Sequence, residues 1–224
     1  MNHVVPLPDP GRLPVLARLH HLPTAAGMTI PFITRTHRDP HHPVWGAVDW
    51  VRHRAAFERG LCQVCGQPLG HRVVVFARPD DWLRGVALEP GLHPECAWYS
   101  SRVCPMLATR LYRYRSNAST AHYRHCDDPA CHCRLWKPPD RDPREASREG
   151  RPADAWYALW IARDHYAIVR HPGDERTPPH IGILLEGVPV LAVRKIRDAT
   201  EPTDRTVLDI LAAQMAMTHL LTRK

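Results

Sequence analysis

The sequence predicts a protein of the α+β class. Three observations lead to this prediction: cysteine and histidine residues stand in pairs at metal-ligand spacing, short β-branched stretches alternate with turn residues, and two segments have the apolar periodicity of helices. The expected strands and helices fall in separate stretches of the chain, which is typical of α+β folds. With 224 residues, the chain is long enough for one or two domains with an apolar core.

In the N-terminal part, the sequence predicts an arm, a strand and a helix. Residues 1–27 contain five prolines and form the arm, with room for a short amphipathic helix at 14–22. Residues 28–36 are rich in β-branched and aromatic side chains and are expected to form a strand. Asp49 is expected to begin a helix that ends at Gly60.

The middle of the chain predicts a hairpin and a second helix. The apolar stretches at 72–77 and 85–89, with a polar turn between them, are interpreted as the two strands of the hairpin. The helix is expected to begin near residue 93 and to be interrupted or restarted at Pro105. Residues 137–154 carry four prolines and almost no apolar side chains, which indicates a polar linker or long loop.

The C-terminal part predicts two hairpins and a final helix. Two residues separate 156–163 from 166–171, and two separate 181–186 from 189–196, so each pair is interpreted as a hairpin, although the first pair could be a helix instead. The final helix is expected to follow a cap at Thr203 or Asp204. Its apolar face would consist of Val207, Leu208, Leu211, Met215 and Leu221.

Four residues in two pairs predict a metal site. Cys62 and Cys65 stand in CxxC spacing, and His93 and Cys96 stand in HxxC spacing at the start of the expected helix. A knuckle, a hairpin and a first helical turn that share one ion describe a zinc treble clef. Three sulfurs and one nitrogen favour Zn²⁺ as the cofactor, and four protein ligands make the site structural. The alternative is two buried cysteine pairs without metal, and Cys104 is interpreted as a core thiol or as a replacement for His93.

A second group of histidines and cysteines could hold a second zinc ion. The simplest ligand set is His125 or His122 together with Cys126, Cys131 and Cys133. The alternatives are a disulfide between Cys126 and Cys131, or a histidine-rich loop without metal. Farther upstream, another histidine-rich stretch could be a metal site, an acid/base site or simply a polar loop; it contains His37, Asp39, His41 and His42.

These motifs divide the chain into four parts. The expected parts are an N-terminal arm at 1–27, a zinc-binding treble-clef domain at 28–136, a polar linker or long loop at 137–154, and a C-terminal α+β lobe at 155–224 that either packs on the zinc domain or stands beside it. No internal repeat is present.

The knuckle LCQVCGQPL and the later stretch HPECAWYSSRVCPML resemble the corresponding motifs of small uncharacterised treble-clef zinc-finger proteins from actinomycetes and their phages. The resemblance covers residues 28–110, and this chain departs from the family pattern at His93, where cysteine is more usual. It implies a zinc module in an actinobacterial or phage setting, and no established activity.

The charge of the chain favours an anionic partner. Thirty basic residues stand against 23 acidic ones, for a net charge of +7. Lys137, Lys195 and Lys224 are the only lysines, so the arginine richness also reflects the composition of a GC-rich genome. The N-terminus lacks the pattern of a signal peptide, and no apolar run approaches about 18 residues, so we expect a cytoplasmic protein without a membrane partner.

The distribution of arginine predicts binding of DNA or RNA. Residues 97–136 carry six arginines against two aspartates, a net +4, and two tyrosines alternate with arginines at 110–115. The alternative is an amphipathic helix with solvated arginines. The expected contacts are Arg102, Arg110, Tyr112, Arg113, Tyr114, Arg115 and Arg124.

Two further function classes remain open. The seven tryptophans would suit a protein partner, in a non-enzymatic interaction or assembly module. A degenerate HNH-type nuclease would need a catalytic histidine on the hairpin, where the sequence offers His71, Asp80 and Asp81, and another metal ligand on the following helix. Common nucleotide-binding and hydrolase motifs are absent, so no catalytic residue is assigned.

Overall fold

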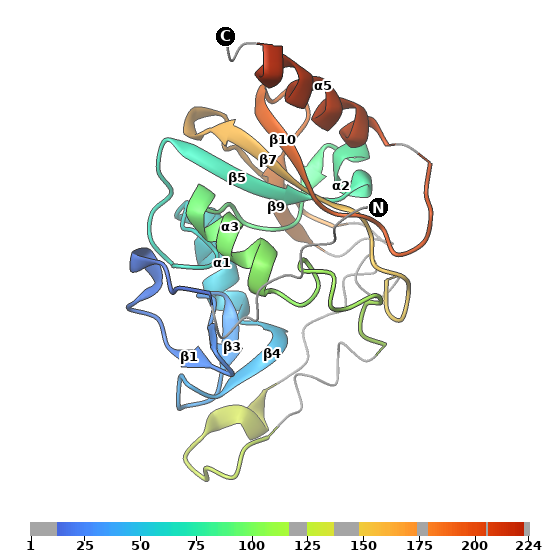
Figure 1. The fold of residues 1–224 in the computed structure, drawn as a ribbon. Coiled ribbons are helices and arrows are strands. Elements are labelled where there is room, and N and C mark those ends of the chain that lie inside the picture. The colour runs from blue at the N-terminus through green and yellow to red at the C-terminus, as the bar shows by residue number, and fades with distance from the viewer. Residues whose placement is uncertain (1–12, 117–124, 137–147, 174–178, 205, 222–224) are drawn as a thin grey trace.

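Two three-stranded antiparallel sheets form the centre of the molecule (Figure 1). The structure, a computed structural model, describes residues 13–116, 125–136, 148–173, 179–204 and 206–221. The first sheet has the order β10 (Val190–Arg197), β7 (Trp156–Ala162), β5 (Arg72–Ala77), and the second has the order β6 (Val86–Ala87), β9 (His180–Leu184), β8 (Ile168–His171). Each sheet therefore joins a strand from the middle of the chain to strands from its C-terminal part. The α+β class is confirmed.

The helices and the smaller strands surround these sheets. Two short hairpins lie in the N-terminal part, β1 (Thr24–Ala25) with β2 (Met28–Thr29), and β3 (Thr34–Thr36) with β4 (Pro43–Val48). The helices are α1 (Trp50–Glu58), α2 (Pro79–Leu83), α3 (Pro94–Val103) and α5 (Val207–Leu221), and the 3₁₀ turns are η2 (Ala17–Leu19), η4 (His132–Leu135) and η5 (Arg163–His165). No helix in the described part of the chain is long and apolar enough to span a bilayer.

Side-chain caps explain where two of the helices begin. The Asp49 carboxylate accepts hydrogen bonds from the backbone N–H groups of Val51 and Arg52, which confirms the predicted start of α1. At α5, the Thr206 N–H donates to the Asp209 carboxylate while the Asp209 N–H donates to the Thr206 hydroxyl. This reciprocal capping box starts α5 at Val207, so the predicted caps at Thr203 or Asp204 are wrong.

The strands exist where the sequence predicts them, but their pairing differs. β5 pairs with β7 and makes a single bridge to Leu92, whereas β6 pairs with β9, so 72–77 and 85–89 do not form a hairpin. The reason is α2, which fills the connection and is fixed by a buried ion pair of 2.8 Å between Arg78 and Asp81. The predicted strand at 28–36 is divided into β2 and β3 around a turn at Pro31.

The C-terminal hairpins also have partners different from those expected. β7 pairs with β5 on one side and with β10 on the other, and β8 pairs with β9. Five of the seven residues of β7 are buried, as is typical of the central strand of a sheet, and η5 directs the chain away after it. Residues of the expected zinc domain and of the expected C-terminal lobe therefore share one sheet and one core, which includes Val75 and Leu159.

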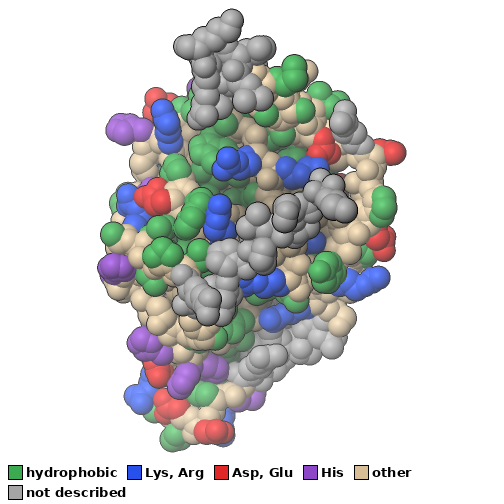
Figure 2. All heavy atoms as spheres, viewed as in Figure 1, with side chains coloured by type: hydrophobic (Ala, Val, Ile, Leu, Met, Phe, Trp, Pro, Cys, Tyr) green, Lys and Arg blue, Asp and Glu red, His purple; other side chains and the backbone are tan. Residues whose placement is uncertain are grey.

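The apolar side chains fall into one large core and two small clusters. The large core lies between the two sheets and α3 and contains fully buried Phe57, Val74 and Leu159. At the other end of the molecule, beside β4 and residues 125–136, the apolar cluster that the described residues form consists of Val44 and Ala47 with Trp136 packed against them (Figure 1). Figure 2 shows that histidine side chains gather at this end. One of the two candidate metal groups lies against the large core, and the other lies beside this small cluster.

Candidate metal centres

The first group brings together the two pairs of residues that the sequence analysis singled out. The ligand atoms of Cys62, Cys65, His93 and Cys96 all lie within 4.8 Å of one another, and all four residues are buried. We name this group site 1. It could hold a metal ion.

The knuckle of site 1 is shaped by backbone hydrogen bonds. The N–H of Cys62 donates to the carbonyl of Gln67, and the N–H of Gly66 donates to the carbonyl of Cys62, each at 2.8 Å. Gly66 has a φ of 71°, and a Cβ at this position would lie 2.7 Å from the Phe32 ring. Only glycine satisfies both conditions, so the residue after the CxxC pair is part of the site.

The other pair is placed by strand β5 and helix α3. Backbone hydrogen bonds between Leu92 and Val74 fix the chain just before His93, which is the N-cap residue of α3, and Cys96 lies in the first turn. His93 Nδ1 lies 3.3 Å from the Cys65 sulfur, and Nε2 donates to the Pro68 carbonyl at 2.9 Å. The second bond orients the ring so that Nδ1 faces the three sulfurs.

The electrostatics of site 1 reflect the proximity of the thiols. Hydrogen bonds to Cys62 and Cys65 raise the pKa of His93 to about 10. Burial opposes ionisation of Cys62, but hydrogen bonds to the side chains of Cys65, Cys96 and His93 outweigh it and lower the pKa of Cys62. A bound cation would replace the proton shared among these groups, as metal binding to thiolates requires.

The N-terminal arm covers site 1, which the sequence analysis did not foresee. Leu19 is fully buried in the large core, and His21 Nε2 donates to the carbonyl of Cys65 at 3.1 Å. Arg18 donates to Glu95 at 2.5 Å and to Gln67 at 2.7 Å, so it links the first turn of α3, which carries Cys96, to the knuckle. The amphipathic pattern at 14–22 was the signal that this part of the arm packs against the protein.

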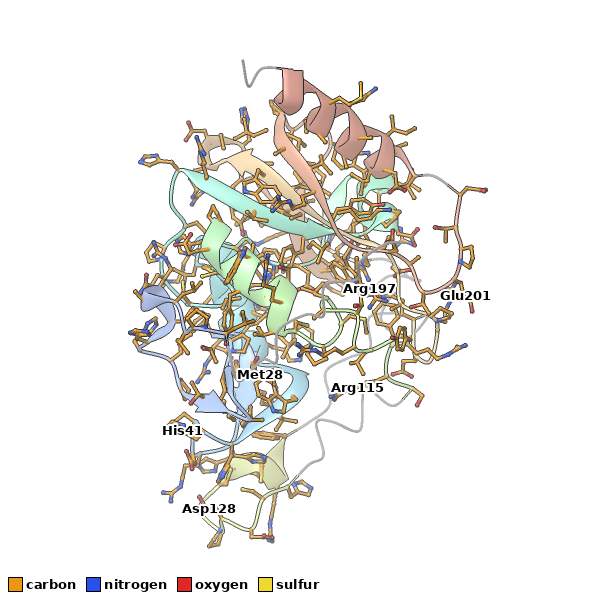
Figure 3. The ribbon with its side chains drawn as sticks, in the orientation of Figure 1. Met28, His41, Arg115, Asp128, Arg197 and Glu201 are labelled. Carbon is orange, nitrogen blue, oxygen red and sulfur yellow. The ribbon has the colours of Figure 1, made fainter. Side chains whose placement is uncertain are left out.

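The second group, site 2, joins segments that lie far apart in the sequence. The ligand atoms of His37, Cys126, Cys131 and Cys133 lie within 4.8 Å of one another. His37 lies in the turn between β3 and β4, and Cys131 and Cys133 lie at η4. Figure 3 shows His41 of the first segment and Asp128 of the second at the same end of the molecule. This group could also hold a metal ion.

The fourth residue of site 2 differs from the expected histidine. His125 is exposed and outside the group, and His122 lies outside the described residues. His37 takes this position, although its upstream neighbours do not join it: His41 Nδ1 bonds the Thr24 carbonyl, and His42 pairs with Asp39 at 3.4 Å. The alternative of a disulfide does not apply, because all seven cysteines are free.

Hydrogen bonds in site 2 favour thiolates. The backbone N–H of Arg38 donates to the Cys131 sulfur, and that of Cys126 donates to the Cys133 sulfur, each at 3.4 Å. Desolvation opposes ionisation of Cys131, but the Arg38 N–H and the His37 ring outweigh it and lower the pKa of Cys131 to about 6. Cys104 belongs to neither site, and burial raises the pKa of its thiol.

Of the residues expected to contact nucleic acid, Arg102 lies in the last turn of α3, and residues 110–115 lie on a loop rather than on a helix. α3 ends at Val103, and Arg197 donates to the carbonyls of Met106 and Leu111, which fixes the loop that follows. Arg102 stacks on Trp98, with the guanidinium carbon 4.3 Å from the ring centroid.

Residues 110–115 make several contacts within the protein. Tyr112 is 65% exposed, and Tyr114 donates to Asp154 at 2.9 Å. Arg113 donates to the carbonyl of Gly150 at 3.1 Å and Arg115 to that of Trp45 at 2.6 Å, and both residues are exposed. Arg110 makes a long contact of 3.5 Å with the Arg102 carbonyl, and Arg124 lies outside the described residues.

The residues considered for nuclease chemistry do not converge on a site. His71 is exposed at the start of β5, Asp80 is exposed on α2, and Asp81 is buried in its ion pair with Arg78. α3 contains no histidine that could add a metal ligand. The described residues therefore give no support to an HNH-type centre.

Site 1 and site 2 define a mixed α+β protein with two Cys₃His groups suited to metal binding. Comparisons with protein-family models, with curated proteins and with solved structures find no match to this chain.

Proposed function

We propose that this chain is a zinc protein that binds nucleic acid, with a structural ion at Cys62, Cys65, His93 and Cys96. The convergence of these four buried ligands is the observation that carries the zinc part of the proposal, and the exposed arginines at 113 and 115 support the nucleic-acid part. Three sulfurs and one nitrogen suit Zn²⁺ better than Mg²⁺ or Ca²⁺. Four protein ligands leave no open position for water or substrate, so the ion stabilises the fold and does not act in catalysis.

The distances in site 1 are consistent with zinc. Bonds of about 2.3 Å to sulfur and about 2.0 Å to nitrogen place the S and N vertices of a tetrahedron about 3.5 Å apart. The Cys65 sulfur and His93 Nδ1 are separated by 3.3 Å. The ring nitrogen opposite Nδ1 already has a carbonyl partner, which is the usual arrangement around a zinc-bound histidine.

The proposed nucleic-acid contacts lie on a fixed, extended loop. Residues 112–114 pair with residues 151–153: the N–H of Tyr114 donates to the Arg151 carbonyl, and the N–H of Ala153 donates to the Tyr112 carbonyl, each at 2.9 Å. This pairing fixes the backbone of the segment that carries the exposed residues Tyr112, Arg113 and Arg115. Arginine can bind phosphate while a neighbouring tyrosine stacks on a base.

A titration of labelled duplex DNA, single-stranded DNA and RNA tests this proposal. We expect the affinity of the zinc-loaded protein to fall steeply between about 50 and 200 mM salt. The double variant Arg113→Gln/Arg115→Gln should bind at least about tenfold more weakly and reduce the slope of log affinity against log salt by about 2. The matched control Arg54→Gln/Arg59→Gln changes the net charge equally, at exposed residues of α1 and its C-cap.

Equal losses in the two double variants would reduce the effect to net charge and contradict a defined surface at 112–115. No binding to any of the three nucleic acids would overturn this part of the proposal and favour a role in protein assembly. Neither result would bear on zinc at site 1, which is tested by metal analysis of the same preparations.

A further inference from the structure

We infer that the protein holds a second zinc ion at His37, Cys126, Cys131 and Cys133, and that this ion fastens residues 125–136 to the β3–β4 hairpin. This inference depends neither on nucleic-acid binding nor on site 1. It assigns His37 as the fourth ligand, although His37 lies 94 residues before Cys131 in the sequence.

The distances within site 2 match a tetrahedral ion. Zinc–sulfur bonds of about 2.3 Å separate two sulfurs by about 3.8 Å, and a sulfur from a nitrogen by about 3.5 Å. The sulfurs of Cys126 and Cys133 are 3.7 Å apart, and the Cys131 sulfur is 3.7 Å from His37 Nδ1. A disulfide needs about 2.05 Å between its sulfurs, so this spacing suits a shared cation and not a covalent bond.

The surroundings orient the ligands as a zinc site requires. Two backbone N–H groups, those of Arg38 and Cys126, donate to ligand sulfurs. The His37 ring stacks on Trp136 with centroids 5.0 Å apart, and the backbone N–H of His37 donates to the backbone carbonyl of His42 at 2.9 Å, which closes the turn that carries the ring. These contacts fix the ring and reduce the freedom that the ligands would lose on binding the ion.

The other interactions that the described residues make around site 2 are weak. The apolar cluster there consists of Val44, Ala47 and Trp136. The ion pair between Arg38 and Asp128 is short, at 2.8 Å, but 66% of the Arg38 side chain is exposed, so solvent weakens it. A structural ion can replace the missing core, as it does in other small modules with few apolar residues.

Metal analysis of the intact chain tests this inference. We expect native mass spectrometry of the wild type to show two zinc ions per chain, and His37→Ala and Cys131→Ser to show one. His125→Ala and His122→Ala are the matched controls, because they remove the two histidines that compete with His37 as fourth ligand, and both should keep two ions.

Cobalt substitution gives a second readout, because the absorption reports the thiolate ligands directly. The wild type loaded with Co²⁺ should show sulfur-to-cobalt charge-transfer absorption of two tetrahedral sites, and Cys131→Ser about half of it. Hydrogen exchange at residues 125–136 should rise in His37→Ala while the amides of β5 and β7 keep their protection.

Three results would overturn the inference. The first is a single zinc ion in the wild type that Cys131→Ser retains. The second is two tightly bound ions in His37→Ala, and the third is loss of one ion in His125→Ala or His122→Ala but not in His37→Ala.

Discussion

The two Cys₃His groups of this protein have the same donor atoms but opposite surroundings. Site 1 lies against the large core, and all four of its residues are buried. Site 2 lies beside three apolar side chains, and two of its residues, His37 and Cys126, are only half-buried. At site 1 a bound ion would add to a core that already exists, whereas at site 2 it would take the place of one.

An estimate of the energies at site 2 supports this difference. Ordering residues 125–136 costs about 18 kcal/mol, at about 1.5 kcal/mol for each residue. Burial of Val44, Ala47 and Trp136 contributes about 5 kcal/mol. A structural zinc ion contributes about 10 to 16 kcal/mol, which brings the balance close to zero. The segment is therefore expected to be ordered with the ion and unfolded without it.

The largest expected effect is global unfolding when a ligand of site 1 is lost. Cys62→Ser should lower the free energy of unfolding by at least about 4 kcal/mol, because it removes the ion and leaves buried polar groups unpaired in the large core. Urea denaturation followed by circular dichroism measures this loss. Cys104→Ser is the control, and it should cost about 1 kcal/mol because Cys104 belongs to neither site. If Cys62→Ser and Cys104→Ser unfolded at the same urea concentration, site 1 would not be a structural centre.

The next effect is the loss of folding stability in acid that comes from His53 in α1. Burial between Trp50 and Phe57 lowers the pKa of His53 to about 4. In the unfolded chain, His53 takes up a proton near pH 6.5. The contribution of neutral His53 to the free energy of unfolding is therefore fully present above pH 6.5, and it is lost as the pH drops towards 4, by at most about 3 kcal/mol.

His53→Phe should therefore lose less stability than the wild type over this range. Both proteins have the same metal ligands, so the difference in their pH profiles isolates His53. Exposed His71→Phe is the control and should follow the wild type. Identical profiles for the wild type and His53→Phe would contradict the low pKa.

A smaller effect is expected from the glycine that closes the knuckle of site 1. Gly66→Ala should cost about 2 kcal/mol, because it combines a positive φ with a clash against Phe32. Gly70→Ala should change stability by less than about 0.5 kcal/mol, since a Cβ there meets no atom within 4 Å. Thermal unfolding of both variants measures the difference, and equal melting temperatures would refute the steric argument.

The smallest effect should be confined to site 2. Arg38→Gln removes an exposed ion pair with Asp128 and is expected to cost less than about 1 kcal/mol, or less than about fivefold in zinc affinity at site 2. Competition with a zinc chelator measures this affinity. A large loss, or any loss at site 1, would show that the two regions are coupled more closely than their separate cores indicate.

The sequence predicted the elements and the ligand pairs that depend on neighbouring residues. Asp49 predicted the start of α1, and the CxxC and HxxC pairs identified residues that converge in site 1. Local spacing could not identify His37, because its partners lie about ninety residues away and only the fold brings them together. The pairing of β5 with β7 was missed for the same reason, and the Thr206 cap because Thr203 and Asp204 offered equally good local candidates.

The pairing of β5 with β7, a strand much later in the chain, has a consequence for synthesis on the ribosome. All four ligands of site 1 precede β7 in the chain, so they leave the ribosome before the strand that pairs with β5 exists. Until β7 emerges, β5 can form its bridge between Val74 and Leu92, but it lacks the strand that pairs with it along its whole length. A metal ion captured at this stage would hold the knuckle, β5 and α3 together while the rest of the chain is translated.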